Sequence, residues 1–179
     1  KYNNNNCMKK EILFCDLDGT LIDTLSGATF PKGVWDMKLK LNVFDKIKEL
    51  APKYIWIVTN QGGLGKFVIE DDFITKCTYI CKCIEEYVGD KDYAPIVNFT
   101  FCGAMEKSDP MRKPNTGMLD LMCSSYRISQ SSEKKATMLM IGDASGKEGQ
   151  FSDSDKKCAE NFHIDYLDVN DFVNTTFNE

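Results

Sequence analysis

The sequence predicts an α/β fold, with a doubly wound, mostly parallel sheet and no large cap domain. Apolar runs that are too short for helices alternate along the chain with longer segments of helical periodicity, as in strand–helix–strand units. Polar or charged residues follow directly after several of these runs. Ligands of open α/β sheets lie beyond the carboxyl ends of the strands, so we expect a functional site at that edge.

The length and composition indicate one globular domain. A chain of 179 residues can bury a sizeable core, and 42% apolar with 27% charged residues is typical of globular proteins. We assign residues 10–179 to this domain and expect residues 1–9, an Asn-rich segment, to be disordered or a linker. No apolar run approaches the length of a membrane span, so we expect no integral membrane protein.

Charge and cysteine content narrow the class of protein. A net charge of −5 argues against a long nucleic-acid footprint, but allows a local grip on one phosphate or a short strand end. The sequence has eight cysteines but no CxxC pair, and His163 is its single histidine. Structural zinc is therefore not expected. Reduced thiols are typical of an intracellular protein, which is the location we expect.

The first predicted strand, residues 12–15, ends in the motif DLDGT at residues 16–20. Alternation along the extended chain turns Asp16 and Asp18 to the same side, and Gly19 allows a tight turn. Two carboxylates this close repel each other unless a cation lies between them, and oxygen ligands suit Mg²⁺. The alternative is an ordinary Asp-Gly turn after a strand.

An insertion, residues 26–40, follows the first strand. Its mixed composition with interspersed Gly and Pro predicts a loop or a short hairpin that overhangs the site. Lys32 and Trp35 could line a substrate channel there. The alternative is that Phe30 and Trp35 simply cover the core.

A predicted helix over residues 42–50 leads to the second strand, residues 54–58. This strand ends in Thr59, Asn60 and Gln61, followed by two glycines. A hydroxyl at a strand end before flexible glycines suits a donor to phosphate oxygens. Taken alone, Thr-Asn after a strand is also common turn chemistry.

A basic pair follows the predicted third strand. A helix over residues 69–88 and a strand over 96–102 precede a loop that leads to Arg112, Lys113 and Pro114. Pro114 fits the first turn of a helix, which leaves Lys113 just before it. A lysine there can reach a phosphate and help neutralise crowded carboxylates. The alternative is a solvated basic pair.

A third strand-terminal acid, Asp143, follows the predicted fourth strand, residues 137–141. A loop rich in serine and acidic residues then opens a helix through residues 156–161, for which Asp153 or Ser154 is the expected cap. The remaining expected elements are a short strand over residues 164–167 and a terminal helical turn over 168–173.

No phosphate-cradling nucleotide loop is found in the sequence. The glycines of residues 142–147 are wrongly spaced for the pattern GxxxxGK[ST], and Glu148 stands where Ser or Thr should be. Residues 62–66 also fail the pattern. We therefore predict no kinase activity in this chain.

The order Asp16/Asp18, Thr59, Lys113, Asp143 resembles the haloacid dehalogenase (HAD) superfamily of phosphohydrolases, which has a Rossmann-like fold, over nearly the whole chain. Finer motifs are similar to the phosphatase domain of the polynucleotide kinase 3′-phosphatase and DNA 3′-phosphatase family. These motifs are Ser26-Gly27, Phe30-Pro31, Thr59-Asn60-Gln61, RKPNTGM at residues 112–118, GDASGK at 142–147 and FSDSDK at 151–156.

Two other interpretations stay open. The first is a sugar-phosphate or histidinol-phosphate phosphatase of the same superfamily. Many of these carry a Cys/His zinc loop, where this chain offers only Cys102 and no histidine. The second is an inactive module that binds phosphorylated ends. Gln150 is a departure from the family pattern, which has an acid before Phe151.

The resemblance implies a mechanism. Asp16 would attack phosphorus and form an aspartyl-phosphate, and Asp18 would act as general acid and then general base. Mg²⁺ would be held by Asp16, the backbone carbonyl of Asp18 and Asp143. Thr59 and Lys113 would hold the phosphoryl oxygens. The residues implied to orient the metal-bound waters are Asp153 and Asp155.

The resemblance further implies that the substrate is a 3′-phosphate at a DNA end or nick, in strand-break repair. A kinase or other repair domain would lie outside this chain. We expect a monomer, and a nuclear location if the source is eukaryotic. The candidate substrate-binding residues are Asn60, Gln61, Lys32, Trp35, Arg112, Lys156 and Lys157.

Overall fold

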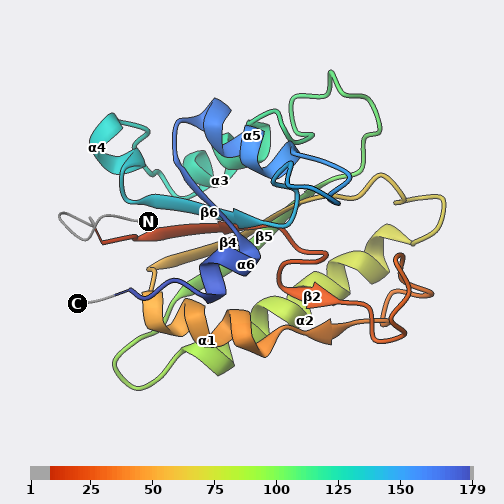
Figure 1. The fold of residues 1–179 in the computed structure, drawn as a ribbon, viewed down its shortest axis with the longest axis horizontal. Helices are drawn as coiled ribbons and strands as arrows, with labels where there is room; N and C mark the ends of the chain where they lie inside the picture. Colours follow the sequence, from red (N-terminus) through yellow and green to blue (C-terminus); the bar gives the residue numbers. More distant parts are fainter. Residues whose placement is uncertain (1–8, 178–179) are drawn as a thin grey trace.

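A five-stranded parallel sheet forms the centre of the structure, a computed structural model that describes residues 9–177 (Figure 1). The strand order is β5-β4-β1-β6-β7, and every neighbouring pair is parallel. The strands are β1 (Ile12–Cys15), β4 (Tyr54–Asn60), β5 (Ile96–Cys102), β6 (Met138–Gly142) and β7 (Asp165–Asp168). This confirms the predicted fold class. Only Lys9 of the predicted N-terminal linker lies within the described residues.

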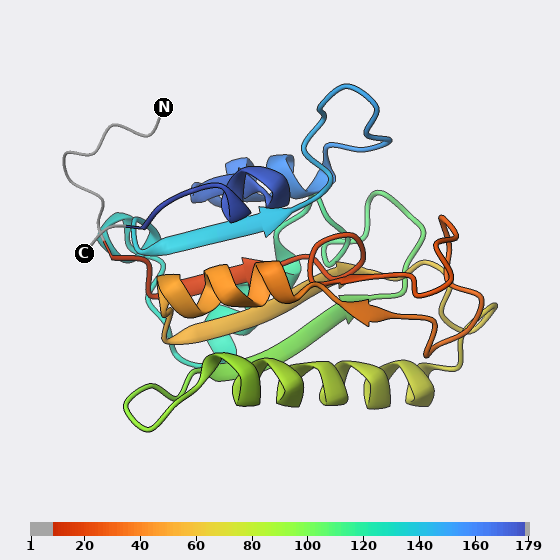
Figure 2. The same cartoon turned by 60° about the horizontal axis from the view of Figure 1, so that its bottom comes forward.

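Helices cover both faces of the sheet, as Figures 1 and 2 show. On one face lie α1 (Leu41–Leu50), α2 (Glu70–Val88) and α6 (Val169–Val173). Toward the other lie α3 (Gly117–Ser125), α4 (Ser132–Lys135) and α5 (Ser154–Phe162). None of the helices in residues 9–177 is long and apolar enough to cross a membrane.

The central strand β1 explains why two separate cores form. All four of its residues are fully buried, and alternate side chains point to opposite faces. Leu13 and Cys15 pack into the core beneath α1 and α2, whereas Ile12 and Phe14 pack into the core beneath α3 and α5. A strand covered on both faces needs apolar residues at every position, which is the pattern in the sequence.

Residues 26–40 form most of the connecting loop and the second strand of a short hairpin, one of the two conformations predicted for this insertion. Strand β2 (Ile22–Asp23) pairs antiparallel with β3 (Lys38–Leu39), and the connecting loop lies on α2. Trp35 meets Tyr79 of α2 edge-on, with ring centroids 5.7 Å apart. The idea that Phe30 and Trp35 cover the core is wrong, since they are 80% and 51% exposed. Met37 and Leu39 of the same insertion pack against the core instead.

The segment around Lys113 folds differently from the prediction. Helix α3 begins at Gly117, so Pro114 does not lie in its first turn. The Asn115 side-chain amide donates to the carbonyls of Lys107 and Asp109, and this holds the segment as a loop. The N–H of Gly117, the first residue of α3, donates to the Pro110 carbonyl in the preceding loop. A side chain that binds loop carbonyls thus competes with an earlier helix start.

The expected cap of α5 is also only half correct. Asp153 occupies the N-cap position, but its side chain makes no capping hydrogen bond. Its carboxylate pairs with Lys157, one turn further on, at 2.8 Å. Strands β1 and β5 have the predicted bounds, and the other elements with predicted bounds differ from the prediction by one or two residues at one or both ends. The clearest example is β4, which runs through Thr59 and Asn60 in register with β5.

The cysteines within the described residues are free thiols. Six of these seven are buried, and Cys83 is half-buried. Burial raises the pKa of Cys77 and Cys81 to about 12, so these thiols stay protonated at neutral pH. They act as small apolar core side chains. Cys7 lies outside the described residues.

Candidate active site

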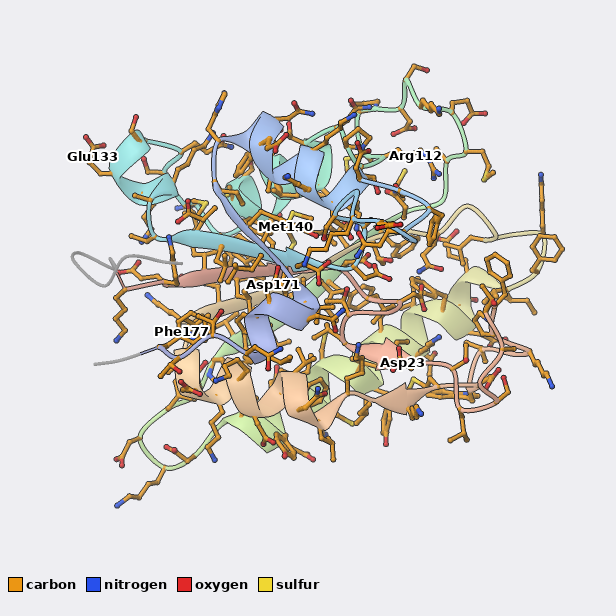
Figure 3. All side chains as sticks on the ribbon, viewed as in Figure 1. Asp23, Arg112, Glu133, Met140, Asp171 and Phe177 are labelled. Carbon is orange, nitrogen blue, oxygen red and sulfur yellow. The ribbon has the colours of Figure 1, made fainter. Side chains whose placement is uncertain are left out.

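The site is built where three neighbouring strands end. Asp16 follows β1, Thr59 is the penultimate residue of β4, and Asp143 follows β6. Because β1 lies between β4 and β6, the parallel topology brings these residues together. Figure 3 shows Asp23 and Arg112 toward the end of the sheet at which these strands end, and Glu133 at the opposite end.

Lys113 is buried at the centre of the site, with 3% exposure. Its Nζ donates to Asp16 Oδ1 and to Asp155 Oδ1, both at 2.7 Å. Asn60 at the end of β4 fixes the lysine backbone: its amide donates to the Lys113 carbonyl at 3.0 Å and accepts from the Lys113 N–H at 2.9 Å. The interpretation of Arg112 and Lys113 as a solvated basic pair is therefore wrong for Lys113.

A cluster of carboxylates surrounds this ammonium group. Asp16, Asp143 and Asp155 each offer an oxygen, and these oxygens lie within 4.8 Å of one another. Burial raises the pKa of Asp16 to about 6, against the opposing effect of the Lys113 ammonium. Burial likewise raises the pKa of Asp155 to about 6 and raises that of Asp143. Burial therefore disfavours the ionised form of these carboxylates, and a further positive charge close to them would favour it.

The cluster fits a divalent cation bound by oxygen. Its three carboxylates carry −3 and Lys113 carries +1, so the ionised cluster has a net charge of −2. Hard oxygen ligands with this charge match Mg²⁺. Asp155 Oδ1 is used by Lys113, and its Oδ2 accepts the Ala144 N–H at 3.1 Å. Asp16 and Asp143 are therefore the carboxylates best placed to bind the ion directly.

Asp18 lies at the exposed edge of the site. Its Oδ2 accepts a hydrogen bond from Gln61 Nε2 at 2.8 Å. The same amide nitrogen donates to Thr59 Oγ1 at 3.0 Å, and Thr59 is almost fully buried. One side chain therefore connects the polar motifs that follow β1 and β4.

The peripheral candidates lie outside this cluster. Lys32, Trp35 and Lys156 are exposed. Lys157 pairs with Asp153, so neither joins the carboxylate cluster. The half-buried Arg112 donates to the Ala104 carbonyl at 2.9 Å.

Sequence reasoning missed the network that holds the loop after Asp143. Gln150 Oε1 accepts the N–H of Ser145 at 2.8 Å, and its Nε2 donates to Asp168 Oδ2 at 2.9 Å. Ser145 Oγ also donates to Asp168 Oδ2, at 2.6 Å. A deprotonated acid at position 150 could not donate a hydrogen bond to Asp168, whereas the Gln150 amide can. The presence of Gln150 where the family pattern has an acid was therefore the one sign of this network in the sequence.

Two glycines let the backbone approach the carboxylates. A Cβ added at Gly19 would lie 2.1 Å from Asp143 Oδ2, and Gly19 has a φ of +76°. A Cβ added at Gly142 would lie 2.4 Å from Asp155 Oδ2 and 2.7 Å from Asp155 Cβ. Neither position can accept a side chain without moving an acid of the site.

Replacing Gly142 with Ala is expected to lower both stability and activity. Asp155 is fixed by Lys113 and Ala144, so the new methyl group must displace it at a cost of about 1–3 kcal/mol. Thermal unfolding and an activity assay measure the two effects. Gly33→Ala is the stability control, because a Cβ there meets nothing within 4 Å. Wild-type stability and activity in Gly142→Ala would contradict the packing argument.

The parallel sheet and the acid–lysine cluster at its carboxyl edge define a phosphatase of the HAD superfamily. A family model described as "Polynucleotide kinase 3 phosphatase" matches residues 11–172. The chain belongs to this family.

Similar proteins include one viral and two yeast sequences. The chain is 31% identical over 174 residues to an uncharacterized 20.8 kDa protein of Autographa californica nuclear polyhedrosis virus, covering 92% of the chain and 86% of that protein. It is 37% identical over 81 residues to the polynucleotide 3′-phosphatase of Saccharomyces cerevisiae, covering 39% of the chain and 34% of that protein. It is 32% identical over 170 residues to the bifunctional polynucleotide phosphatase/kinase of Schizosaccharomyces pombe, covering 93% and 38%. The matched parts are thus only about a third of each yeast protein.

Solved structures confirm the fold. D,D-heptose 1,7-bisphosphate phosphatase from B. bronchiseptica, crystallised with magnesium and phosphate, superposes with a TM-score of 0.64 at 15% identity, covering 87% of this chain and 78% of that one. A protein from Mesorhizobium loti described as a HAD-like phosphatase gives a TM-score of 0.60 at 19% identity, covering 87% and 69%. At these identities the likeness concerns the fold alone.

Proposed function

We propose that this phosphatase removes the 3′-phosphate from DNA ends or nicks, with Mg²⁺ as cofactor and an aspartyl-phosphate on Asp16 as intermediate. The observation that carries the proposal is the buried Lys113 held between Asp16 and Asp155 beside Asp143. Membership in a family named for a polynucleotide 3′-phosphatase supports the choice of substrate. The complete set of reactive groups argues against an inactive binding module.

The residues divide the chemistry among them. Asp16, fixed by Lys113 through one oxygen, would attack phosphorus in line. Bound Mg²⁺, held by Asp16, Asp143 and the backbone carbonyl of Asp18, would offset the charge of the phosphoryl oxygens. Two of the three donors of the Lys113 ammonium are used, so the third is available to the phosphoryl group. The Thr59 hydroxyl accepts from Gln61, which leaves its proton for the same purpose.

The insertion gives the DNA proposal a second line of support. Trp35 and Tyr79 are each 51% exposed and lie in contact, and Lys32 is exposed in the same insertion. Aromatic side chains can stack on unpaired nucleobases, and a lysine can neutralise a backbone phosphate. A short grip of this kind is compatible with the net charge of −5.

Phosphate release from a 3′-phosphorylated oligonucleotide tests the proposal, beside its 5′-phosphorylated twin and a panel of sugar phosphates, with Mg²⁺ present. Strongly 3′-selective release is the expected result. Release mainly from a sugar phosphate would keep the chemistry and reject the DNA substrate. No release from any of them by the folded, metal-loaded protein would favour the inactive module.

Variants of the peripheral residues separate DNA binding from chemistry. Lys32→Ala, Trp35→Ala and the double variant Lys156→Ala/Lys157→Ala should lose activity on the oligonucleotide but keep it on a small phosphate ester. Each side chain lies outside the carboxylate cluster, so only contacts with the longer substrate should be lost. An equal loss on both substrates, or no loss, would remove these residues from the binding surface.

Adding Mg²⁺ is expected to raise the melting temperature, because the cation offsets a cluster with a net charge of −2. At a concentration one hundred times the Kd the gain is about 2.7 kcal/mol. Asp143→Asn should melt no lower than the wild type without metal and should lose most of the Mg²⁺ shift. The exposed Asp92→Asn is the control that should keep the full shift. A full shift in Asp143→Asn would remove Asp143 as a ligand.

A further inference from the structure

Gln61 holds the Asp18 carboxylate from one side. Among the described residues its amide is the only side-chain or backbone group that hydrogen-bonds to that carboxylate. Asp18 is otherwise exposed, so without this bond its side chain is free to rotate into solvent. The bond joins residues 43 positions apart, from the motifs that follow β1 and β4.

The backbone of Gln61 is itself fixed. Its N–H donates to the Cys102 carbonyl at the end of β5, at 2.7 Å, and its carbonyl accepts from Leu64 at 3.2 Å. Gly62 leaves room for Met105, whose Sδ lies 2.1 Å from where a Cβ would stand. Gln61 is therefore anchored to the sheet and can fix the position of a neighbouring side chain.

The amide nitrogen is the correct group for both partners. Nε2 carries two protons, and the structure directs one to Asp18 Oδ2 and the other to Thr59 Oγ1. The reversed orientation would place the amide oxygen against a carboxylate oxygen, which is repulsive. With Oδ2 occupied by an N–H donor, Oδ1 is the oxygen left to carry a transferable proton.

From this geometry we propose that Gln61 is a positioning residue for the general acid, rather than a substrate contact. The inference rests on the proposed function, in which Asp18 is that acid. In the first half-reaction the Asp16 oxygen bonds to phosphorus, the bond to the leaving oxygen breaks, and the Oδ1 proton moves to that oxygen. In the second, water attacks the aspartyl-phosphate, its proton passes to Asp18 Oδ1, and phosphate and Asp16 are released.

The dependence of rate on the leaving group tests this role. 4-Nitrophenyl phosphate releases a stable anion and needs little help from an acid, phenyl phosphate needs more, and an oligonucleotide 3′-phosphate needs most. Gln61→Met keeps the size of the side chain and removes the donor. We expect kcat/KM to fall less than about 3-fold for the nitrophenyl ester and about 10²-fold for the oligonucleotide, with phenyl phosphate between them.

The matched control is Gln130→Met. Gln130 also donates through Nε2 to a carboxylate, Asp120 Oδ1 at 3.0 Å, but on an exposed surface formed by α3 and the loop after it. It should leave all three rates unchanged, and melting temperatures of both variants show that each is folded. An equal fall on all three substrates would show that Gln61 binds the phosphoryl group or supports the fold, and unchanged rates would show that Asp18 needs no partner; either overturns the proposal. A wild-type protein that hydrolyses none of them would instead reject the proposed function.

Discussion

Asp16→Asn is expected to lower turnover by about 10⁴-fold or more, with the fold intact. An amide keeps the shape of the carboxylate but cannot attack phosphorus to form the covalent intermediate. It also removes one of the three clustered negative charges, and Lys113 keeps its other partner, Asp155. The metal-free variant should therefore melt at or above the wild-type temperature.

Steady-state phosphate release together with thermal unfolding checks both parts of this expectation. A loss of activity caused by unfolding would appear as a lower melting temperature, so the two measurements separate chemistry from stability. Appreciable residual turnover in a folded Asp16→Asn protein would remove Asp16 as the nucleophile.

Lys113→Met is expected to destabilise the protein by about 3–5 kcal/mol and to abolish activity. The side chain of Lys113 is 2% exposed, and its loss leaves Asp16 and Asp155 buried without a counter-ion. Lys157→Met, which breaks an exposed pair on α5, should cost less than about 1 kcal/mol. Denaturant titration in the absence of Mg²⁺ measures both changes.

The destabilisation caused by Lys113→Met should depend on pH. Burial already places the pKa of Asp16 and Asp155 at about 6, above the unfolded values, and removing Lys113 raises both further. The folded variant then binds protons more strongly than its unfolded chain. The loss in free energy of unfolding relative to the wild type should therefore be largest above pH 6 and become smaller at lower pH. Adding Asp155→Asn should restore part of the stability but no activity. A deficit independent of pH would point to lost packing instead of uncompensated charge.

The core of the site could be predicted because its residues follow directly after strands. Once the strands are parallel and neighbouring, Asp16, Thr59 and Asp143 must meet at one edge, whatever the loops do. Lys113 was predicted from its motif, although the helix expected after it starts later. Loop conformation depends on bonds such as that of Asn115 to two distant carbonyls, which no local pattern encodes.

The contacts of the supporting amides could not be predicted. Asn60 binds the Lys113 backbone 53 positions away, and Gln61 binds Asp18 43 positions away. The sequence named both as candidate substrate-binding residues and not as partners of Lys113 and Asp18, because an amide carries no charge or periodicity that identifies its partner. In the sequence, Gln150 stood out only because it replaces an acid of the family pattern. Its role could be recognised only from the structure, in which its amide donates to Asp168.

The long sequence separations within the site also affect how activity returns during refolding. The Lys113 ammonium joins Asp16 across 97 positions and Asp155 across 42. Closing loops of this size costs entropy before the contacts can form, so we expect these contacts to form late in folding. The carboxylate cluster cannot form in a half-formed sheet, and regained turnover is therefore expected to report that β1, β4 and β6 have all reached their native register.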